Sequence, residues 1–327
     1  MPICEADPWR LQYFDGVPCP ETVNIPTEDS DAWVWNPRHR WVYDKLAVAH
    51  SQGLEAGPHG TAPPRFPVFS KPIMNLRGMG IESRVLGSAQ DYKRHTTAGH
   101  MWMTLLEGRH VSSDVAVVDG APRWWRHVTG KPAGEGTFDY WTVHADPEPE
   151  IEQCCCCWIA DHLAGYTGMI NLETIGGAII EVHLRFSDQW PDLYGVGWVE
   201  AIIRLHHRGI WEFADLDRRE GYSVVLFGPQ GRYRHPAPDE VSAILAMPDV
   251  SSVQITFHED WSPERHAMPP GGFRLAIVNC WDLNTGFAAR ERLRSYFLPD
   301  ANMTGAATGA PSLSSSPRND AIDPNRT

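Results

Sequence analysis

The sequence predicts an α+β fold built mainly on antiparallel sheets. Short runs of apolar and β-branched residues recur along the chain, and turn pairs such as Asp119-Gly120 favour hairpins between them. Helical patterns are fewer and do not alternate regularly with the strands, which argues against a parallel βαβ sheet. We expect helices at 43–52, 149–163 and 198–208, and strands at 66–73, 101–106, 113–118, 123–128, 222–227 and 274–279.

Composition divides the chain into segments. Residues 1–42 include a stretch rich in Pro, Asp and Glu and are expected to be irregular. Residues 43–189 hold the predicted core, and residues 190–300 are expected to add a C-terminal α+β region that completes the fold or the substrate site. Residues 301–327 carry Ser, Pro, Asn and Ala without periodicity and are expected to be disordered.

The composition of the 327-residue chain is typical of a soluble globular protein, with 21% charged and 42% apolar residues. A net charge of −13 argues against a dedicated nucleic-acid binder, which needs a basic face. No secretory signal is visible at the N-terminus, and no apolar run approaches the ~18 residues of a membrane span. We therefore expect a cytoplasmic protein that binds neither membrane nor nucleic acid.

Seven cysteines, four of them consecutive at 154–157, fit neither a disulfide framework nor a spaced zinc motif. Adjacent side chains on a helix point outwards at steps of about 100°, so four neighbouring thiols do not converge on one ion. The run is expected to supply small apolar residues to the helix at 149–163 of a reduced protein.

The most informative stretch is a predicted hairpin at 167–186. In its second strand the apolar side chains face one way and the polar ones face the other: Ile180, Val182, Leu184 and Phe186 against Glu181, His183 and Arg185. A carboxylate, an imidazole and a guanidinium then stand in a row, about 7 Å apart along the strand. Such a set suits a divalent metal and a phosphate, whereas the plain alternative is a half-exposed hairpin whose polar face meets water.

The register of this hairpin decides which residues of the first strand share the polar face. A three-residue loop at 175–177 places Asn171 opposite Glu181. It also places Met169 opposite His183. A two-residue Gly-Gly loop instead puts the two sets on opposite faces, because a slip of one residue flips every side chain. We predict the three-residue loop, since its last residue, a glycine, supplies the positive φ that such loops need.

Three motifs precede the hairpin. Tyr43-Asp44-Lys45 begins a helix, P-V-F-S-K-P at 67–72 ends a strand at Lys71, and L-L-E-G at 105–108 ends another strand. Together with E-V-H-L-R at 181–185, they resemble the nucleotide-binding core of the ATP-grasp superfamily in order and spacing, over residues 43–186. That core has a D-K pair, a P-V-x-x-K-P strand before a glycine loop, a hinge strand ending near a glutamate and a glycine, and a final E-x-N-x-R.

The resemblance implies two α+β subdomains whose antiparallel sheets enclose a nucleotide cleft. It implies that two lysines, a glycine loop and the hinge bind ATP, namely Lys45, Lys71, Gly78, Gly80, Leu105, Leu106 and Glu107. It assigns a Mg²⁺ site, with Mn²⁺ as the alternative ion, to Asn171, Glu173, Glu181 and His183. It assigns catalytic roles to Lys71 and to Arg185, which would stabilise the charge of a phosphorylated intermediate.

The chain departs from the family pattern in two places. His183 stands where the family has a metal-binding asparagine, and Asn171 or Glu173 stands for the first acidic ligand. His183 therefore either contacts substrate or phosphate, or favours Mn²⁺. About 40 residues precede Lys45. Because the family usually has a full α/β domain there, we expect residues 190–300 or a partner subunit to supply the missing substrate surface.

The function that the resemblance implies is an ATP-dependent carboxylate–amine ligase. It forms an amide or peptide bond through an acyl phosphate and releases ADP and phosphate, with small-molecule carboxylates and amines as substrates and with homo-oligomer formation left open. Two alternatives stay open as well: a non-catalytic nucleotide-binding relative, and an ATP-grasp kinase that stops at phosphoryl transfer. His110 and Asp114, just after the hinge, either line the nucleotide pocket or have structural roles.

Overall fold

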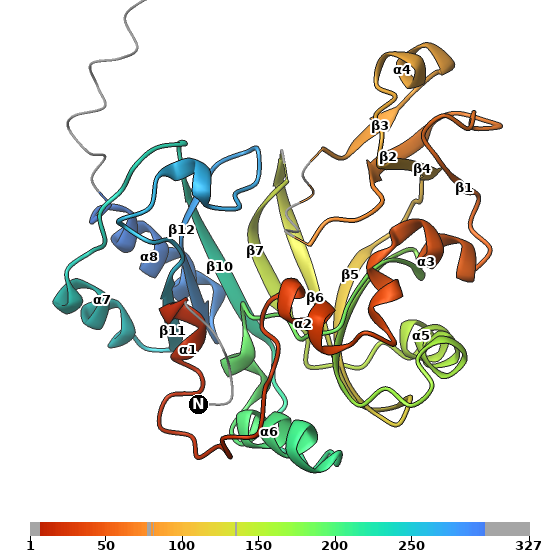
Figure 1. Cartoon of the computed structure of the whole chain (residues 1–327). Coiled ribbons are helices and arrows are strands. Elements are labelled where there is room, and N and C mark those ends of the chain that lie inside the picture. The colour runs from red at the N-terminus through yellow and green to blue at the C-terminus, as the bar shows by residue number, and fades with distance from the viewer. Residues whose placement is uncertain (1–6, 77–79, 81, 135, 298–327) are drawn as a thin grey trace, which may run out of the picture.

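Two antiparallel sheets organise the chain, whose residues 7–76, 80, 82–134 and 136–297 are described in a computed structural model (Figure 1). The small sheet has the strand order β1-β4-β2-β3 and lies at the upper right of Figure 1. The large sheet has the order β11-β12-β10-β7-β6-β5-β8-β9, and its neighbouring strands are antiparallel throughout. The predicted α+β class with antiparallel sheets is therefore confirmed.

The strands of the small sheet are short, and those of the large sheet reach 14 residues. The small sheet contains β1 (Ala56–Pro58), β2 (Val68–Pro72), β3 (Arg84–Leu86) and β4 (His100–Thr104). The large sheet contains β5 (His110–Val118), β6 (Ala121–Gly134), β7 (Thr137–Val143), β8 (Gly168–Ile175), β9 (Ala178–His183), β10 (Gly221–Gly228), β11 (Val250–Ile255) and β12 (Phe273–Cys280).

The helices of the described residues flank these sheets. They are α1 (Pro8–Leu11), α2 (Asp29–Trp35), α3 (Lys45–Ser51), α4 (Ala89–Arg94), α5 (Pro149–His162), α6 (Trp198–Arg208), α7 (Pro238–Leu245) and α8 (Leu283–Arg294), with 3-10 turns at Arg40–Tyr43, Pro191–Tyr194 and Pro263–Arg265. The helices predicted at 43–52, 149–163 and 198–208 correspond to α3, α5 and α6. Among the described residues, no helix has both the length and the apolar character needed to cross a bilayer.

Local sequence explains where the site-bearing helix α3 begins and ends. The carboxylate of Asp44 accepts a hydrogen bond from the Ala47 backbone NH at 2.9 Å, which caps the first turn. Gly53, with φ of +74°, follows the last turn and lets the chain reverse. The Lys45 backbone NH donates to Ile73 O at 2.9 Å, so the start of α3 is fixed to the end of β2.

Different helices cover the two faces of the large sheet. Helix α5 packs Ile151, Cys155, Trp158 and Ile159 on apolar residues of β5, β8 and β9. On the opposite face, α6, the 3-10 turn at 191–194 and the N-terminal segment enclose a second core that includes Trp124, Trp190, Tyr194 and Trp198. Helices α7 and α8 pack beside β10–β12 (Figure 1).

The N-terminal segment differs from the irregular chain expected for residues 1–42. It contains α1 and α2, and its residues Phe14, Val23 and Ile25 are buried in the second core. Burial of these apolar side chains against the sheet favours the folded segment, while Asp15 and Glu21 between them stay exposed to water. Strands β10–β12 from the 190–300 region continue the same sheet as β5–β9.

The hairpin of β8 and β9 corrects the predicted register. Ile175 pairs with Ala178, so the loop has two residues, Gly176 and Gly177, rather than three. The ladder then shifts between Glu173 and Thr174, which leaves Ile180 as an extra residue in β9. This bulge restores a shared polar face, but with other partners: Asn171 lies opposite His183, and Glu173 lies opposite Glu181.

The bulge also breaks the strict alternation expected from Ile180 to Phe186. Ile179, Val182 and Leu184 lie together in the core under α5, whereas Ile180 packs with Met101 and Met103 of the small sheet. The cysteine run at 154–157 is also less buried than expected for residues that supply an apolar face. Of the four, only Cys155 is buried, and Cys154 and Cys157 are exposed.

Candidate functional site

The polar face of the hairpin gathers ionisable groups that come from distant parts of the chain. Ligand atoms of Glu173, Glu181 and His183 all lie within 4.8 Å of one another. His110 of β5 adds its Nε2 at 3.2 Å from Glu173 Oε2. Burial opposes the ionisation of Glu173. The hydrogen bond from His110, together with the positive charges of His110, His183 and Lys45, nevertheless holds the pKa of this carboxyl well below its usual range.

Two lysines from outside the hairpin reach this cluster. Lys45, at the start of α3, places Nζ 2.6 Å from Glu181 Oε1 in an ion pair with little exposure. Lys71, near the end of β2, donates from Nζ to the carbonyl of the bulged residue Ile180 at 2.8 Å. Burial lowers the pKa of Lys71 to about 8, although the nearby Glu181 raises it. The bulge thus provides the acceptor that brings the small sheet's lysine to the hairpin.

An aspartate of the N-terminal segment binds the far end of the hairpin. Asp29, at the start of α2, is 2% exposed. Its Oδ2 lies 3.0 Å from His183 Nδ1, and its two oxygens face Nε and Nη2 of Arg185 at 2.9 and 3.0 Å. Tyr43 also donates its hydroxyl to Asp29 Oδ1 at 3.1 Å. Asp29 therefore holds His183 and Arg185 together.

The charges around Asp29 stabilise one another in the ionised form. Burial opposes ionisation of this carboxyl, but Arg185 and His183 lower its pKa far below the usual value. Burial would also lower the pKa of His183, yet the charge of Asp29 raises it. Since Arg185 makes a two-pronged pair with Asp29, its guanidinium is already engaged by a carboxylate of this chain.

Asn171 belongs to a different hydrogen-bond network. Its amide nitrogen donates to Ser112 Oγ at 2.9 Å and to Asp114 Oδ1 at 2.7 Å, both on β5. Burial raises the pKa of Asp114 to about 6, although hydrogen bonds from Tyr194, Asn171 and the Ser187 backbone favour its charged form. Asn171 faces His183 across the ladder, and a metal-binding role for it stays a prediction.

The predicted hinge contacts the hairpin turn. A β-carbon on Gly176 would collide with the carbonyl oxygen of Glu107, and one on Gly108 would lie 2.8 Å from the Cα of Gly176. Leu106 packs with Ile180, Met101 and Met103 in an apolar cluster between the two sheets, and Leu105 precedes it in the chain. Gly80 is exposed with φ of +59°, and Gly78 lies outside the described residues.

Sequence reasoning overlooked Asp29 and the part played by His110. Asp29 lies in a segment expected to be irregular, and no motif marks it. His110 could have been paired with Glu173 once β5 and β8 were recognised as neighbours, because Ser112 pairs with Glu173 in that ladder. The other predicted groups, Lys45, Lys71, Glu173, Glu181, His183 and Arg185, do converge, through the contacts given above.

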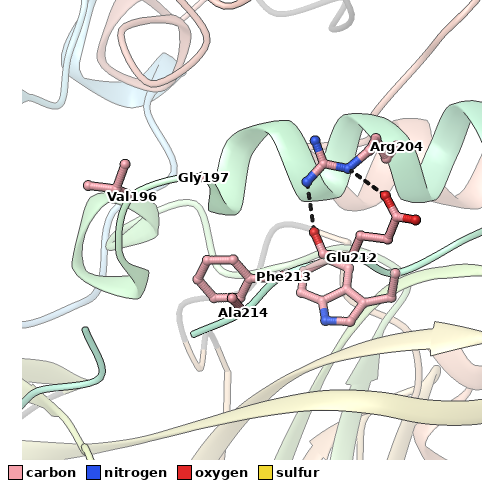
Figure 2. A pocket seen from close by; sticks show the side chains of 7 residues that line it. Val196, Gly197, Arg204, Glu212, Phe213 and Ala214 are labelled. Carbon is pink, nitrogen blue, oxygen red and sulfur yellow. Dashed lines mark hydrogen bonds and ion pairs between the residues drawn. The ribbon is translucent and has the colours of Figure 1, made fainter. Parts of the chain in front are cut away.

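A separate open groove lies between α6 and the segment 211–214 (Figure 2). Its volume is about 590 Å³, and its lining includes Val196, Arg204, Trp211 and Phe213. Figure 2 shows the Arg204 guanidinium directed at Glu212, whose carbonyl accepts a hydrogen bond at 2.7 Å. No residue assigned from the sequence lines this groove, and nothing in the described residues indicates what would cover it.

Comparison with known proteins places the fold. No family model matches the chain, and no curated protein matches its sequence. Solved structures do match. An L-amino acid ligase from Bacillus licheniformis gives a TM-score of 0.56 at 10% identity, over 77% of this chain and 70% of that chain. Phosphoribosylamine–glycine ligase from Thermotoga maritima gives 0.56 at 14% identity, over 84% of each chain.

The chain has the ATP-grasp fold. A further ATP-grasp neighbour is a carboxyaminoimidazole ribonucleotide synthase from Aspergillus clavatus complexed with ATP, with a TM-score of 0.55 and 10% identity over 79% of this chain and 74% of that chain. These identities are low, so the likeness establishes the ATP-grasp fold alone. The resemblance that the sequence motifs indicated is confirmed at that level.

The donor set of the site fits a divalent cation. Two donor atoms that each lie about 2.1 Å from one ion are about 3 Å apart when adjacent and about 4 Å apart when opposite. His183 Nε2 lies 3.6 Å from Glu181 Oε2 and 4.0 Å from Glu173 Oε1, within that interval. Two carboxylates and an imidazole therefore converge, with their ligand atoms within 4.8 Å of one another and with a nitrogen donor that Mg²⁺ does not favour.

Proposed function

We propose that this protein is an ATP-dependent ligase that activates a substrate carboxylate as an acyl phosphate and transfers the acyl group to an amine. The observation that carries the proposal is the convergence of Lys45, Lys71, Glu173, Glu181 and Arg185 from three separate segments, on a chain with the ATP-grasp fold. Basic and acidic groups that meet in this way are the parts that phosphoryl transfer needs, because its catalysis consists of positioning and charge stabilisation.

In this proposal the two lysines bind the phosphates of ATP as point charges. To do so, Lys45 leaves Glu181 and Lys71 leaves the Ile180 carbonyl, so phosphate oxygens replace acceptors that the chain itself supplies in the nucleotide-free protein. Leu106, which is half-buried and packs on the buried Met101 and Met103, offers an apolar surface for the adenine ring at the hinge. The cost of separating the buried pair is offset by charge-assisted bonds to phosphate.

Glu173, Glu181 and His183 would hold the divalent cation, which neutralises charge on the phosphates during transfer. Arg185 stabilises the negative charge of the phosphorylated carboxylate once Asp29 yields part of its two-pronged pair. The amine then attacks the acyl carbon, the C–O bond to phosphate breaks, and the amine loses a proton to solvent or to a nearby carboxylate. The products are an amide, ADP and phosphate.

A specific observation also favours a second candidate, a nucleotide-binding protein without ligase chemistry. The Asp29 carboxylate engages Arg185 on two atoms, so the arginine is not free for a substrate anion in this state. If that contact never opens, ATP binds without turnover. A kinase that stops after phosphoryl transfer is a third candidate, since it would need the same groups and no amine.

The deciding experiment measures ADP release from ATP and a dication against mixtures of amino acids and small carboxylic acids, with and without added amines. The ligase predicts ADP formation that requires a carboxylate and yields an amide by mass spectrometry. A kinase gives a stable phosphorylated product without amine. A thermal-shift response to ATP with no ADP formed over hours on the full panel would contradict the ligase and support the non-catalytic candidate.

A further inference from the structure

The two ring nitrogens of His183 have different surroundings. Nδ1 lies 3.0 Å from Asp29 Oδ2, a hydrogen bond between groups that are both buried. Nε2 faces Glu181 and Glu173 at 3.6 and 4.0 Å, and no hydrogen bond joins it to any described residue at those distances. The ring is only 6% exposed, so one nitrogen is fixed and the other is aimed, without a hydrogen-bond partner, at two carboxylates.

This arrangement is the one that metal-binding histidines adopt. A ligating histidine donates its second ring N–H to a carboxylate or carbonyl, which fixes the tautomer and directs the free nitrogen at the ion. Here Asp29 supplies that carboxylate, and Tyr43 and Arg185 hold it in place. An asparagine at position 183 would offer an oxygen instead. It has no second ring nitrogen for the Asp29 carboxylate to orient.

The donor chemistry selects among dications. Mg²⁺ takes oxygen ligands in near-octahedral geometry, whereas an imidazole nitrogen raises affinity for first-row transition ions. Among these ions affinity is lowest for Mn²⁺, rises to Cu²⁺ and falls again at Zn²⁺. We propose that Asp29 is a positioning residue that makes His183 a nitrogen ligand, so that the cluster with Glu173 and Glu181 binds a first-row transition dication in preference to Mg²⁺. This inference deepens the proposed function, because the same cluster is the proposed metal site, and it rests on that site's being used.

Lys45 is the internal competitor of such an ion. Its ammonium group lies 2.6 Å from Glu181 Oε1, on the carboxylate whose Oε2 faces His183, so its positive charge opposes a dication bound there. Binding of nucleotide would draw Lys45 to a phosphate and thereby release Glu181. In the absence of nucleotide, a Lys45→Met variant is therefore expected to bind the dication more tightly than the wild type, by about 10-fold.

The experiment titrates the full chain with MnCl₂ without nucleotide, following free Mn²⁺ by electron paramagnetic resonance and adding MgCl₂ or ZnSO₄ as competitors. Pulsed measurements on protein labelled with ¹⁵N-histidine report whether a histidine nitrogen is bound to Mn²⁺. The wild type is expected to show that nitrogen coupling. Added ZnSO₄ should displace its bound Mn²⁺ readily, whereas added MgCl₂ should displace little of it. His183→Asn should lose the coupling and lower the Mn²⁺/Mg²⁺ affinity ratio at least 10-fold.

Asp29→Asn tests the positioning role. Loss of an outer partner of a metal-bound histidine lowers metal affinity by about 10- to 100-fold, and we expect that loss with a weakened nitrogen coupling. His50→Asn, on the exposed side of α3, is the matched control and should change neither quantity. A purely structural role for Asp29 would alter the thermal midpoint and leave the coupling of the folded protein as it is in the wild type.

The labelled wild type decides the proposal even where a variant fails to fold. Absence of a histidine coupling, or an equal preference for Mn²⁺ and Mg²⁺ in wild type and His183→Asn, would overturn it. The metal preference and the proposed ligase can fail independently of each other. If ADP forms but no histidine nitrogen couples to Mn²⁺, the ligase proposal stands and this inference is overturned. If a histidine nitrogen couples to Mn²⁺ but no ADP forms, this inference stands and the ligase proposal is contradicted.

Discussion

Lys45 Nζ and Glu181 Oε1 lie 2.6 Å apart and join helix α3 to the edge strand β9 of the large sheet. The two side chains are 8% and 19% exposed, so the pair is largely withdrawn from water. A pair of this kind contributes little net stability relative to apolar residues, but loss of one partner leaves the other charge buried. The pair therefore holds two proposed ligand-binding side chains in place in the nucleotide-free protein.

The first prediction concerns this pair. Lys45→Met removes the cation from an acidic cluster, and we expect the free energy of unfolding to fall by about 3 kcal/mol. Glu181→Gln should lower the free energy of unfolding by a similar amount, because it leaves the buried ammonium group of Lys45 without its carboxylate partner. The double variant should lose less than the sum, with a coupling of about 1–3 kcal/mol in urea denaturation.

Glu291→Gln is the matched control for this cycle. Glu291 pairs with Arg294 on the exposed side of α8 at 3.1 Å, and such surface pairs contribute less than about 1 kcal/mol. Strict additivity of the two changes at Lys45 and Glu181 would show that the contact contributes nothing to the folded state.

The second prediction separates function from stability at Lys71. Burial lowers the pKa of this lysine to about 8, so carrying its proton at pH 7 costs folding free energy. That cost is present below the folded pKa and is relieved as pH rises towards the unfolded value. Lys71→Met should therefore unfold at pH 7 with a free energy at least equal to the wild type, while the rate of ADP formation falls at least about 100-fold.

Lys93→Met, on the exposed surface of α4, is the control and should change neither quantity. Full activity in Lys71→Met would remove this residue from the proposed phosphate site. A large loss of stability would instead mean that its bond to the Ile180 carbonyl outweighs the cost of its burial.

Patterns within short stretches of sequence predicted those site residues that lie within a single helix, strand or motif. The apolar spacing predicted α6 with its observed bounds, and the motifs at Lys45, Lys71 and Glu181 were found from short stretches of sequence. The bulge at Ile180 was not predictable from the turn, because a Gly-Gly pair permits either loop length. The choice depends on tertiary burial: the bulge lets Ile179 and Val182 share the core under α5.

Asp29 illustrates what remains out of reach of sequence patterns. It lies 154 residues from His183, and only the packing of α2 against the hairpin gives it a role. Asp29 is the first residue of α2, where an acidic side chain normally only complements the helix dipole. Here its carboxylate binds His183 and Arg185 instead. No periodicity encodes such a long-range contact.

The third prediction uses the two glycines of the hairpin turn. Both have positive φ, +57° at Gly176 and +86° at Gly177, so alanine is strained at either position. Gly177 has open space around a new β-carbon, whereas Gly176 would meet the carbonyl oxygen of Glu107. Gly176→Ala should therefore cost at least about 1 kcal/mol more unfolding free energy than Gly177→Ala, measured in urea, because of the added collision.

The same pair of variants probes the hinge. Gly176→Ala must shift the backbone at Glu107, where the proposed adenine contact lies, so its affinity for ATP should fall by more than that of Gly177→Ala. Equal ATP affinities in the two variants, measured by calorimetry, would argue that the hinge does not contact the nucleotide.

The last prediction is a pH dependence that arises far from the proposed chemistry, at His206 on α6. Its Nε2 is buried without a hydrogen-bond partner among the described residues, and burial lowers the pKa of His206 to about 4. The unfolded chain, in which histidine has its ordinary pKa near 6.5, binds the proton more readily below neutrality. Stability from this residue is therefore present above pH 6.5 and is lost as pH falls towards 4, by roughly 2 kcal/mol at pH 5. His206→Gln should flatten the fall in unfolding free energy between pH 8 and pH 5, whereas His207→Gln, its exposed neighbour, should leave that fall unchanged. If both variants follow the wild-type curve, the acid sensitivity of the fold originates elsewhere and His206 titrates alike in the folded and unfolded states.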